Sequence, residues 1–206
     1  MAKMTKPETT DHSTEDKIKV AAAKVFISKG FAAARTRDIA EEAGINLALL
    51  NYYFRSKEKL FDIVMIESLQ KLLVGVRDIL NDVNSSLTEK ITFLTNHYLN
   101  LLKNDTDLPL FVLNEIRANP LILEANIEVK EIFLQSNFYQ QLEAKTKGKV
   151  EPVHFVMNIA GLIFFPFVLS PLLKGIRGES KEGFEALIEE RKNRIPLWID
   201  AMLKTD

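Results

Sequence analysis

One short stretch carries the residue types that could do chemistry: residues 46–54, NLALLNYYF. If this stretch is a helix, Leu50 and Phe54 fall on one side, which matches the apolar stripes of the two helical segments before it. That side is expected to be buried. The opposite side carries Ala48, Leu49, Asn51 and Tyr52. Such groups suit base-pair edges better than water, because alanine permits close approach, asparagine can pair with adenine and apolar groups meet thymine methyls.

Two short helices joined by a glycine turn would position this surface. Thr36 is a good N-cap for a first helix, in which Ile39 and Ala40 share one stripe. Gly44 follows where a left-handed residue ends a helix, and Asn46 is of the N-cap type for the second helix. This arrangement is a helix-turn-helix, whose second helix enters the major groove of duplex DNA.

Longer helices are expected on both sides of this pair. A helix that begins at Ser13 repeats apolar residues at helical spacing until Gly30 closes it. The residues before it, 1–12, are predicted to form a flexible arm. After the pair, a helix from Lys57 keeps an apolar stripe as far as Leu80.

Three segments of this region carry a resemblance to a known family: KGF, ARTRDIAEEAGIN and NYYFRSKEKLF. They resemble the N-terminal domain of the tetracycline-repressor (TetR) family of bacterial regulators, almost continuously over about residues 15–63. Residues 64–206 resemble that family only in size and helical character. The resemblance implies a homodimer that binds a near-palindromic operator in double-stranded DNA, usually as a repressor. It also implies release by a small-molecule effector bound in the C-terminal helices.

The resemblance implies roles for single residues as well. Thr36 resembles the family's phosphate-binding cap, and Arg37 beside it can reach a base or a phosphate. Tyr52 and Tyr53 stand where the family contacts phosphates, with core packing or staple contacts as the alternative for both. Lys57 stands at the place of a phosphate-binding lysine, although a lone lysine is more often simply solvated. The positions at which the family reads bases are Leu47, Ala48 and Asn51, next to the cap Asn46.

Two positions depart from the family pattern. Asn51 stands where many members have tyrosine, and Tyr53 stands where many have histidine. Both lie on the expected reading helix, so the operator sequence does not follow from the resemblance.

The rest of the chain is also predicted to be helical. Helices are expected after Ser86, from Pro109 to Asn119, and at about residues 128–145, 152–173 and 184–202. No segment with the period of a strand competes. The sequence therefore predicts an all-α protein of about nine helices. A three-helix helix-turn-helix domain at residues 13–60 would be followed by a helical ligand-binding and dimerisation bundle at residues 61–206.

The most apolar segment, residues 153–173, leaves two interpretations open. It lacks any charge over a length close to a membrane span, so a membrane-tethered regulator is one of them. His154, Asn158 and Pro166 argue against a span, and a helix that is apolar all round is equally expected where other helices cover it. We therefore expect no membrane partner, but a dimer interface between this helix, the last helix and their symmetry mates. The residues expected there are Phe155, Ile159, Leu162, Ile195, Trp198 and Met202.

An effector site would need polar side chains among apolar neighbours. Four polar residues and three aromatic walls fit that description, although ordinary surface or core positions are the alternative for each. They are His97, Asn114, Arg117 and Asn137, with Phe111, Phe133 and Phe138. No class of effector follows from these residues.

Composition excludes several functions. The 206-residue chain has no cysteine, so disulfides, thiolate metal sites and cysteine nucleophiles are excluded. His12, His97 and His154 lack metal-binding spacing, and no nucleophile elbow, P-loop or dinucleotide fingerprint occurs. We expect no metal, no cofactor and no catalysis, and a helical enzyme is the weakest alternative.

Charge is distributed unevenly along the chain. Through Phe61 there are 11 Lys and Arg against 8 Asp and Glu, whereas the remainder has 16 against 20. A mildly basic N-terminal part fits nucleic-acid binding, although the difference is small. The N-terminal residues contain no apolar secretory segment, so a cytoplasmic location is expected.

Overall fold

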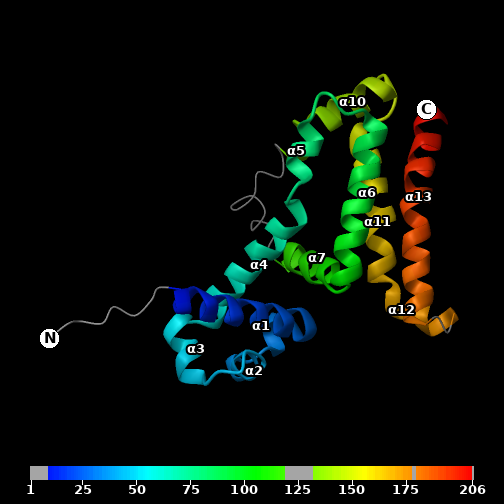
Figure 1. Cartoon of the computed structure of the whole chain (residues 1–206). Helices are drawn as coiled ribbons and strands as arrows, with labels where there is room; N and C mark the ends of the chain where they lie inside the picture. The colour runs from blue at the N-terminus through cyan, green and yellow to red at the C-terminus, as the bar shows by residue number, and fades with distance from the viewer. Residues whose placement is uncertain (1–8, 119–131, 178–179, 206) are drawn as a thin grey trace. The chain divides into compact units, whose positions relative to one another are not determined.

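The computed structural model describes residues 9–118, 132–177 and 180–205 (Figure 1). Within these ranges there are eleven helices and no strand, which confirms the all-α prediction. The chain divides into two compact units, Met1–Lys71 and Leu72–Asp206. This division falls inside the fourth helix, after the boundary expected at residue 60. Residues of that helix as far as Leu69 are buried.

The first unit contains α1 (Thr9–Ala33), α2 (Thr36–Glu42), α3 (Leu47–Tyr53) and most of α4 (Lys57–Leu73). All four helices contribute fully buried side chains: Ile18, Phe26, Ile39, Leu50, Leu60 and Met65. The ring of Phe61 meets that of Phe26 edge-on, with 5.0 Å between centroids. Each such side chain contributes about 1.5–3 kcal/mol when fully buried. Helices as short as α2 and α3 depend on this packing, because they are too short to be stable alone.

Three ion pairs tie α1 to its neighbours. Lys19 reaches Glu67 of α4 at 3.0 Å, Lys24 reaches Glu42 of α2 at 3.1 Å, and Lys29 reaches Asp38 of α2 at 2.9 Å. Hydrogen bonds to Asp16 and to Glu67 raise the pKa of Lys19 to about 12. Pairs at the surface contribute little stability individually, so the ion pairs mainly fix the orientation of α1.

The ends of α1 differ in part from the prediction. The helix is already formed at Thr9, so Ser13 lies inside it and residues 9–12 are not an arm. Residues 1–8 lie outside the described residues. At the other end, Gly30 interrupts the helix with φ 73 and ψ 164, where the sequence predicted its end. Glycine is suited to this conformation because it has no Cβ.

The stripe predicted to run from Lys57 to Leu80 belongs to two helices. α4 ends at Leu73, Gly75 takes a left-handed φ of 74, and α5 (Val76–Asn81) begins directly afterwards. A single helix was predicted because Val76 and Leu80 continue the apolar spacing, and both are indeed buried. The positive φ of Gly75 breaks the helix without breaking the pattern of burial.

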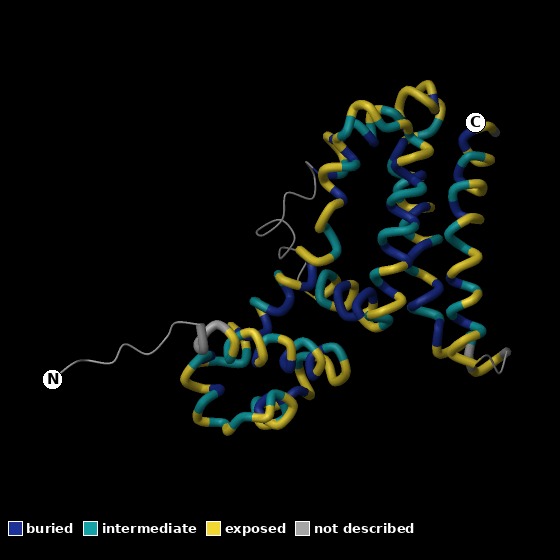
Figure 2. Tube along the Cα trace, in the orientation of Figure 1, coloured by how far each residue is buried: buried dark blue, intermediate teal, exposed yellow. Residues whose placement is uncertain are grey.

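The second unit continues from α5 with α6 (Leu87–Asn104), α7 (Leu108–Ala118), α10 (Asn137–Thr146), α11 (Pro152–Val168), α12 (Ser170–Arg177) and α13 (Lys181–Thr205). α6, α11 and α13 run alongside one another (Figure 1). All three helices contribute buried residues (Figure 2). The predicted start after Ser86 is confirmed, because Ser86 and Glu89 form a reciprocal capping box.

A buried lysine joins two segments of the second unit. Lys90 of α6 is fully buried, and its ammonium donates to the carbonyl oxygens of Asp82 (2.5 Å) and Ser85 (2.7 Å). It also donates to Asn137 Oδ1 at 3.2 Å, which joins the loop before α6 to the start of α10. Burial lowers the pKa of Lys90. The carbonyl and amide oxygens offset part of the cost of burying this charge.

Pro166 weakens one turn of α11, and α13 compensates for it. Pro166 has no N–H, so the carbonyl of Leu162 in α11 loses its helical partner. Arg191 of α13 replaces that partner, since its Nη2 donates to Leu162 O at 2.6 Å. The guanidinium also lies 5.3 Å from the Trp198 ring, so one arginine joins α13 to the weakened turn of α11.

Other predicted helix bounds need correction. The segment 152–173 is two helices: α11 ends at Val168, with Leu169 as its C-cap, and α12 begins at Ser170. With this break and the one at Gly75, the described ranges contain eleven helices, where about nine were predicted for the whole chain. α10 starts at Asn137, because the Ser136 hydroxyl caps it by accepting from the Tyr139 N–H at 3.2 Å. The predicted bounds at residues 119–120 and 128 lie outside the described residues.

The apolar segment 153–173 also bears on the membrane alternative. None of the helices in the described ranges combines the length and hydropathy that a membrane span requires. The division after Val168 leaves α11 with 17 residues, fewer than the roughly 20 that a span usually needs. The membrane-tethered interpretation is therefore not favoured.

Candidate nucleic-acid interface

The turn between α2 and α3 is built from backbone hydrogen bonds around Gly44. The Ile45 N–H donates to Ala40 O at 2.9 Å, and the Gly44 N–H donates to Glu41 O at 3.0 Å. This pair of bonds is the Schellman motif, which requires a left-handed residue, and Gly44 has φ 66. The predicted glycine turn is therefore confirmed. It places the start of α3 a short distance after the end of α2.

α3 presents the two sides that the sequence predicted. Asn46 caps the helix, since its Oδ1 accepts from the Leu49 N–H at 2.8 Å. Leu50 and Phe54 are buried, with 1% and 6% of their surfaces exposed. The exposed side carries Ala48, Asn51 and Tyr52, with Leu47 and Leu49 half-buried beside it.

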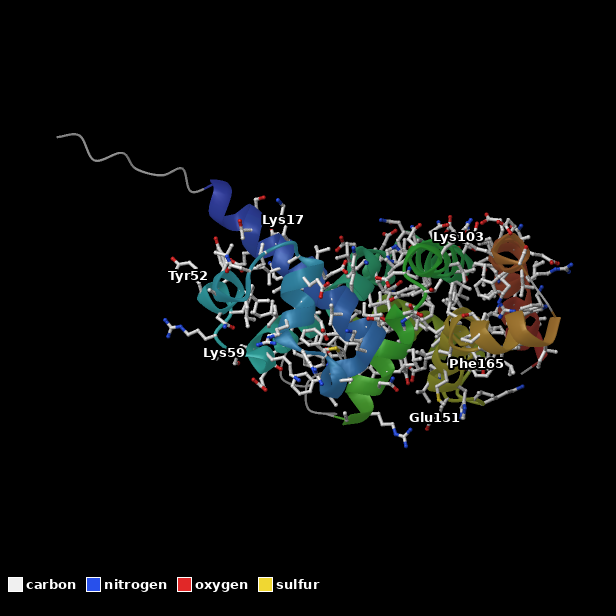
Figure 3. The ribbon with its side chains drawn as sticks, turned by 90° about the horizontal axis from the view of Figure 1, so that it is seen from below. Lys17, Tyr52, Lys59, Lys103, Glu151 and Phe165 are labelled. Carbon is white, nitrogen blue, oxygen red and sulfur yellow. The ribbon has the colours of Figure 1, made fainter. Side chains whose placement is uncertain are left out.

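The two tyrosines at the end of α3 have different surroundings. Tyr52 is 74% exposed and projects from α3 (Figure 3), which is an unusual position for a large ring unless a partner covers it. Tyr53 is half-buried, and its ring meets that of Tyr52 edge-on at 5.3 Å. Tyr52 can therefore reach an external partner more freely than Tyr53.

The start of α2 corrects one prediction. The N-cap is Arg35, with extended φ −113 and ψ 147, and Thr36 is the first helical residue. Thr36 is half-buried there, whereas Arg37 is exposed. Asp38 holds the cap, because its Oδ2 accepts from the Arg35 N–H at 3.2 Å. A hydrogen bond from Lys29, and then that from Arg35, lower the pKa of Asp38.

Lys57 has partners within the protein. Its ammonium donates to the carbonyl oxygens of Phe31 (3.0 Å) and Ala34 (3.2 Å), and it lies 4.2 Å from the Phe31 ring centroid. Its phosphate-binding role stays a prediction. Three other cations near the helix ends were missed by the sequence analysis, although each is exposed: Arg35, Arg55 and Lys59. The sequence offered one signal for these three cations, because each is a basic residue at or near a helix end.

The predicted dimer residues divide into two groups. Phe155, Ile159 and Ile195 are 2%, 5% and 0% exposed, so they belong to the core of the protomer and their prediction as interface residues is corrected. Leu162 is half-buried, and Trp198 and Met202 are exposed. The large exposed residues that the prediction missed are Met157, Phe165 and Leu197. All of these lie on helices that are apolar on more than one side, which is why periodicity did not separate them.

The exposed residues of α11 and α13 adjoin one another. Asn158 Nδ2 lies 3.7 Å from Met202 Sδ, across the two helices. On α11 the exposed residues share one face, at helical spacing: His154, Met157, Asn158, Gly161 and Phe165. The two helices therefore present a shared, largely apolar surface.

The predicted effector residues lie in different surroundings on α6, α7 and α10 and just before α10. Phe111 and Phe138 are buried, Phe133 is half-buried, and Asn114 and Arg117 are exposed. Asn137 is already bonded to Lys90. His97 stacks on Phe93 with centroids 5.5 Å apart, and its Nε2 is buried without a hydrogen-bond partner. Burial lowers the pKa of His97.

The Schellman turn, the capped α3 and its exposed arc define a helix-turn-helix DNA-binding protein. Residues 18–64 match the family model described as bacterial regulatory proteins, tetR family. The chain is 22% identical over 201 residues to the probable HTH-type transcriptional regulator YttP of Bacillus subtilis, covering 94% of this chain and 95% of YttP. It is 36% identical over 89 residues to the HTH-type transcriptional repressor NicS of Pseudomonas putida, covering 42% of each.

Solved structures agree on the fold. The transcriptional regulator FadR of Bacillus subtilis, solved in complex with stearoyl-CoA, superimposes with a TM-score of 0.55 at 20% identity, covering 87% of this chain and 96% of FadR. At this identity the likeness speaks for the fold alone. The family match covers residues 18–64, and the likeness in fold extends over most of the chain.

Proposed function

We propose that the chain is a homodimeric repressor that binds a near-palindromic operator through α3 and is released by a small molecule. The observation that carries this proposal is the exposed arc of Ala48, Asn51 and Tyr52 on a capped helix. Direct base readout falls to Ala48 and Asn51, with Leu47 at the edge of the arc. Backbone contacts come from the flanking residues Thr36, Arg37, Asn46, Tyr52, Tyr53 and Lys57.

A second copy of the chain is required for affinity. One helix-turn-helix makes few base contacts, whereas two at a fixed separation engage successive grooves and gain affinity without new contacts. The shared surface of α11 and α13 supports such a dimer, because Met157, Phe165 and Leu197 are 65%, 57% and 64% exposed. Apolar surface of this kind marks a protein–protein contact. Two helices from each protomer would form a four-helix interface.

The effector would bind in the second unit, near His97. The unpartnered Nε2 of His97 is a hydrogen-bonding group without a protein partner, and the flanking Phe93 and Tyr98 rings are apolar. FadR, whose fold is similar, was solved in complex with stearoyl-CoA, so an acyl-CoA is a candidate effector. Release follows if the effector binds more tightly to a conformation of the bundle in which the two helix-turn-helix domains no longer match the spacing of the DNA grooves. A differential affinity of about 1–3 kcal/mol is sufficient.

The repressor role and the cytoplasmic site of action follow from this proposal. NicS, which shares the N-terminal part, is named a repressor. A bound dimer blocks transcription when its operator overlaps a promoter, and the bacterial chromosome lies in the cytoplasm. A reporter gene downstream of the operator tests this role: its expression should fall when the protein is present, and a rise would identify an activator.

Selection of bound duplexes from a random DNA pool tests the proposed function. We expect two half-sites related by a dyad, with centres about one helical turn apart or a multiple of it. A protein that binds no duplex DNA at low salt would overturn the proposal. Repeating the selection with candidate effectors, acyl-CoA thioesters among them, identifies the ligand by loss of the enriched sequence.

A further inference from the structure

Arg191 of α13 makes two contacts, one to α11 and one within its own helix. Its Nη2 donates at 2.6 Å to the carbonyl oxygen of Leu162, which Pro166 leaves without a helical partner. Its guanidinium also lies 5.3 Å from the ring centroid of Trp198, seven residues later on the same side of α13. The bond to α11 therefore holds the guanidinium at a fixed place beside the Trp198 ring.

The contacts of Arg191 differ from those of the neighbouring cations on α13. Lys192 and Arg194 form ion pairs with Glu189 and Glu190. Arg191 is half-buried, no carboxylate among the described residues pairs with it, and its Nε is buried without a hydrogen-bond partner. Burial lowers the pKa of Arg191. A charge placed in this way is costly unless its contacts serve a purpose, and those contacts are a carbonyl and a ring.

Trp198 lies on the shared surface of α11 and α13. It is the single tryptophan of the chain, and 39% of its surface is exposed. Met202, one turn further along α13, is also exposed and lies against Asn158 of α11. Tryptophan is enriched among the residues that dominate the energy of protein contacts. A side chain that is already held in its bound orientation loses less freedom on association, so a fixed Trp198 ring would strengthen a dimer.

We propose that Arg191 is a positioning residue of the dimer, which holds the Trp198 ring in the orientation that packs against a second copy of the chain. The inference rests on the proposed dimer. Arginine suits this role because its planar guanidinium stacks on an aromatic face while its N–H groups donate to a carbonyl. When the second copy covers the pair, exclusion of water strengthens the attraction between cation and ring. The effect of Arg191 on association therefore requires Trp198.

A double-mutant cycle on the dimer dissociation constant tests this dependence. Wild type, Arg191→Met, Trp198→Leu and the double variant are compared by analytical ultracentrifugation of the full chain. We expect Trp198→Leu to weaken the dimer about thirtyfold or more. Arg191→Met should weaken it about tenfold. The double variant should stay within about twofold of Trp198→Leu, because no ring is left for Arg191 to hold.

The fluorescence of Trp198 reports on positioning directly, since the chain has no other tryptophan. Its steady-state anisotropy is measured in wild type and in Arg191→Met, at a concentration at which both are monomeric. We expect a lower anisotropy in Arg191→Met, because the ring gains rotational freedom inside a folded protomer. An unchanged anisotropy would show that Arg191 does not hold the ring.

Two further variants separate positioning from stability and from charge. Arg191→Lys keeps a donor for the Leu162 carbonyl but lacks the planar group that stacks on the ring. It should fold like wild type, with a weaker dimer and a lower anisotropy, and it serves as the test variant if Arg191→Met is unfolded. Arg194→Met removes an exposed charge of the same helix, whose partner is Glu190, and should dimerise within about twofold of wild type. Circular dichroism at the assay temperature verifies that each variant is folded.

The outcomes separate this inference from the proposed dimer. Folded Arg191 variants that dimerise like wild type, or losses that add in the double variant, overturn the positioning role. An equal loss in Arg194→Met also overturns it, because the charge of α13 would then be the cause. A wild type that sediments as a monomer overturns the proposed dimer itself. A Trp198→Leu variant that dimerises like wild type overturns the proposed interface, and both of these results are visible without any Arg191 variant.

Discussion

The two units of the chain differ in how their exposed surfaces relate to their cores. In the first unit, α3 has one clearly buried side, with Leu50 and Phe54, and one exposed side, with Asn51 and Tyr52. In the second unit, α11 is apolar on both its buried side, such as Ile159, and its exposed side, such as Phe165. A contrast between residue types identifies a functional surface from sequence. Where a partner surface is as apolar as the core, that contrast is lost.

The largest expected effect concerns the buried side of α3. Leu50→Ala should destabilise the first unit by about 2–5 kcal/mol, because it removes a fully buried side chain and leaves a cavity. Thermal unfolding followed by circular dichroism measures the loss. The neighbouring exposed Asn51→Ala should stay within about 0.5 kcal/mol of wild type. Equal losses for the two variants would mean that α3 has no solvent-facing side.

The exposed apolar face of the second unit should matter for association and not for folding of the protomer. Phe165→Glu places a charge in the proposed interface and should weaken the dimer by about 2 kcal/mol or more, roughly thirtyfold in Kd. Analytical ultracentrifugation measures this change. Val83→Glu is a matched control, since Val83 is 73% exposed in the loop before α6. If Phe165→Glu dimerises like Val83→Glu, the interface lies elsewhere.

Asn51 should carry sequence choice at a single position. Asn51→Ala is expected to cost about 1–3 kcal/mol at one base pair of each half-site and to relax selection there. Binding to unrelated duplex DNA should change little, because that binding depends on phosphate contacts. Competition between the operator and point-substituted operators measures the effect. A uniform loss over all sequences would remove Asn51 as a base reader.

Two glycines, one in each unit, should respond in opposite directions. Gly44 has φ 66, so Gly44→Ala should destabilise the turn by about 1–2 kcal/mol. Gly175 lies in the helix α12 with open space around it, so Gly175→Ala should stabilise by about 0.4–1 kcal/mol. Chemical denaturation measures both. A neutral Gly44→Ala would contradict the left-handed turn between α2 and α3.

The smallest expected effect concerns His97. Burial lowers its pKa in the folded protein below the unfolded value of 6.5, so the unfolded chain binds more protons between the two values. Stability should therefore be complete above about pH 6.5 and fall as the pH drops through this window. Denaturation at about pH 7.5 and about pH 5 should show a smaller decrease for His97→Phe than for wild type. An identical decrease in both would mean that His97 titrates normally.

Much of the first unit was determined by the sequence alone. The glycine turn at Gly44, the Asn46 cap and the two sides of α3 all depend on neighbours within a few residues, and all agree with the structure. Local hydrogen bonds and helical spacing are short-range effects, so they are legible in a short window of sequence.

The tertiary structure decided the features that depend on distant partners. It engaged Lys57 with carbonyls of residues 26 and 23 positions away in the chain. It buried Phe155, Ile159 and Ile195 and left Phe165 and Leu197 at the surface. The sequence shows that a residue is apolar, and helical periodicity shows on which side of its helix it lies. Which neighbour covers that side is set by packing between helices far apart in sequence, and no local pattern encodes it.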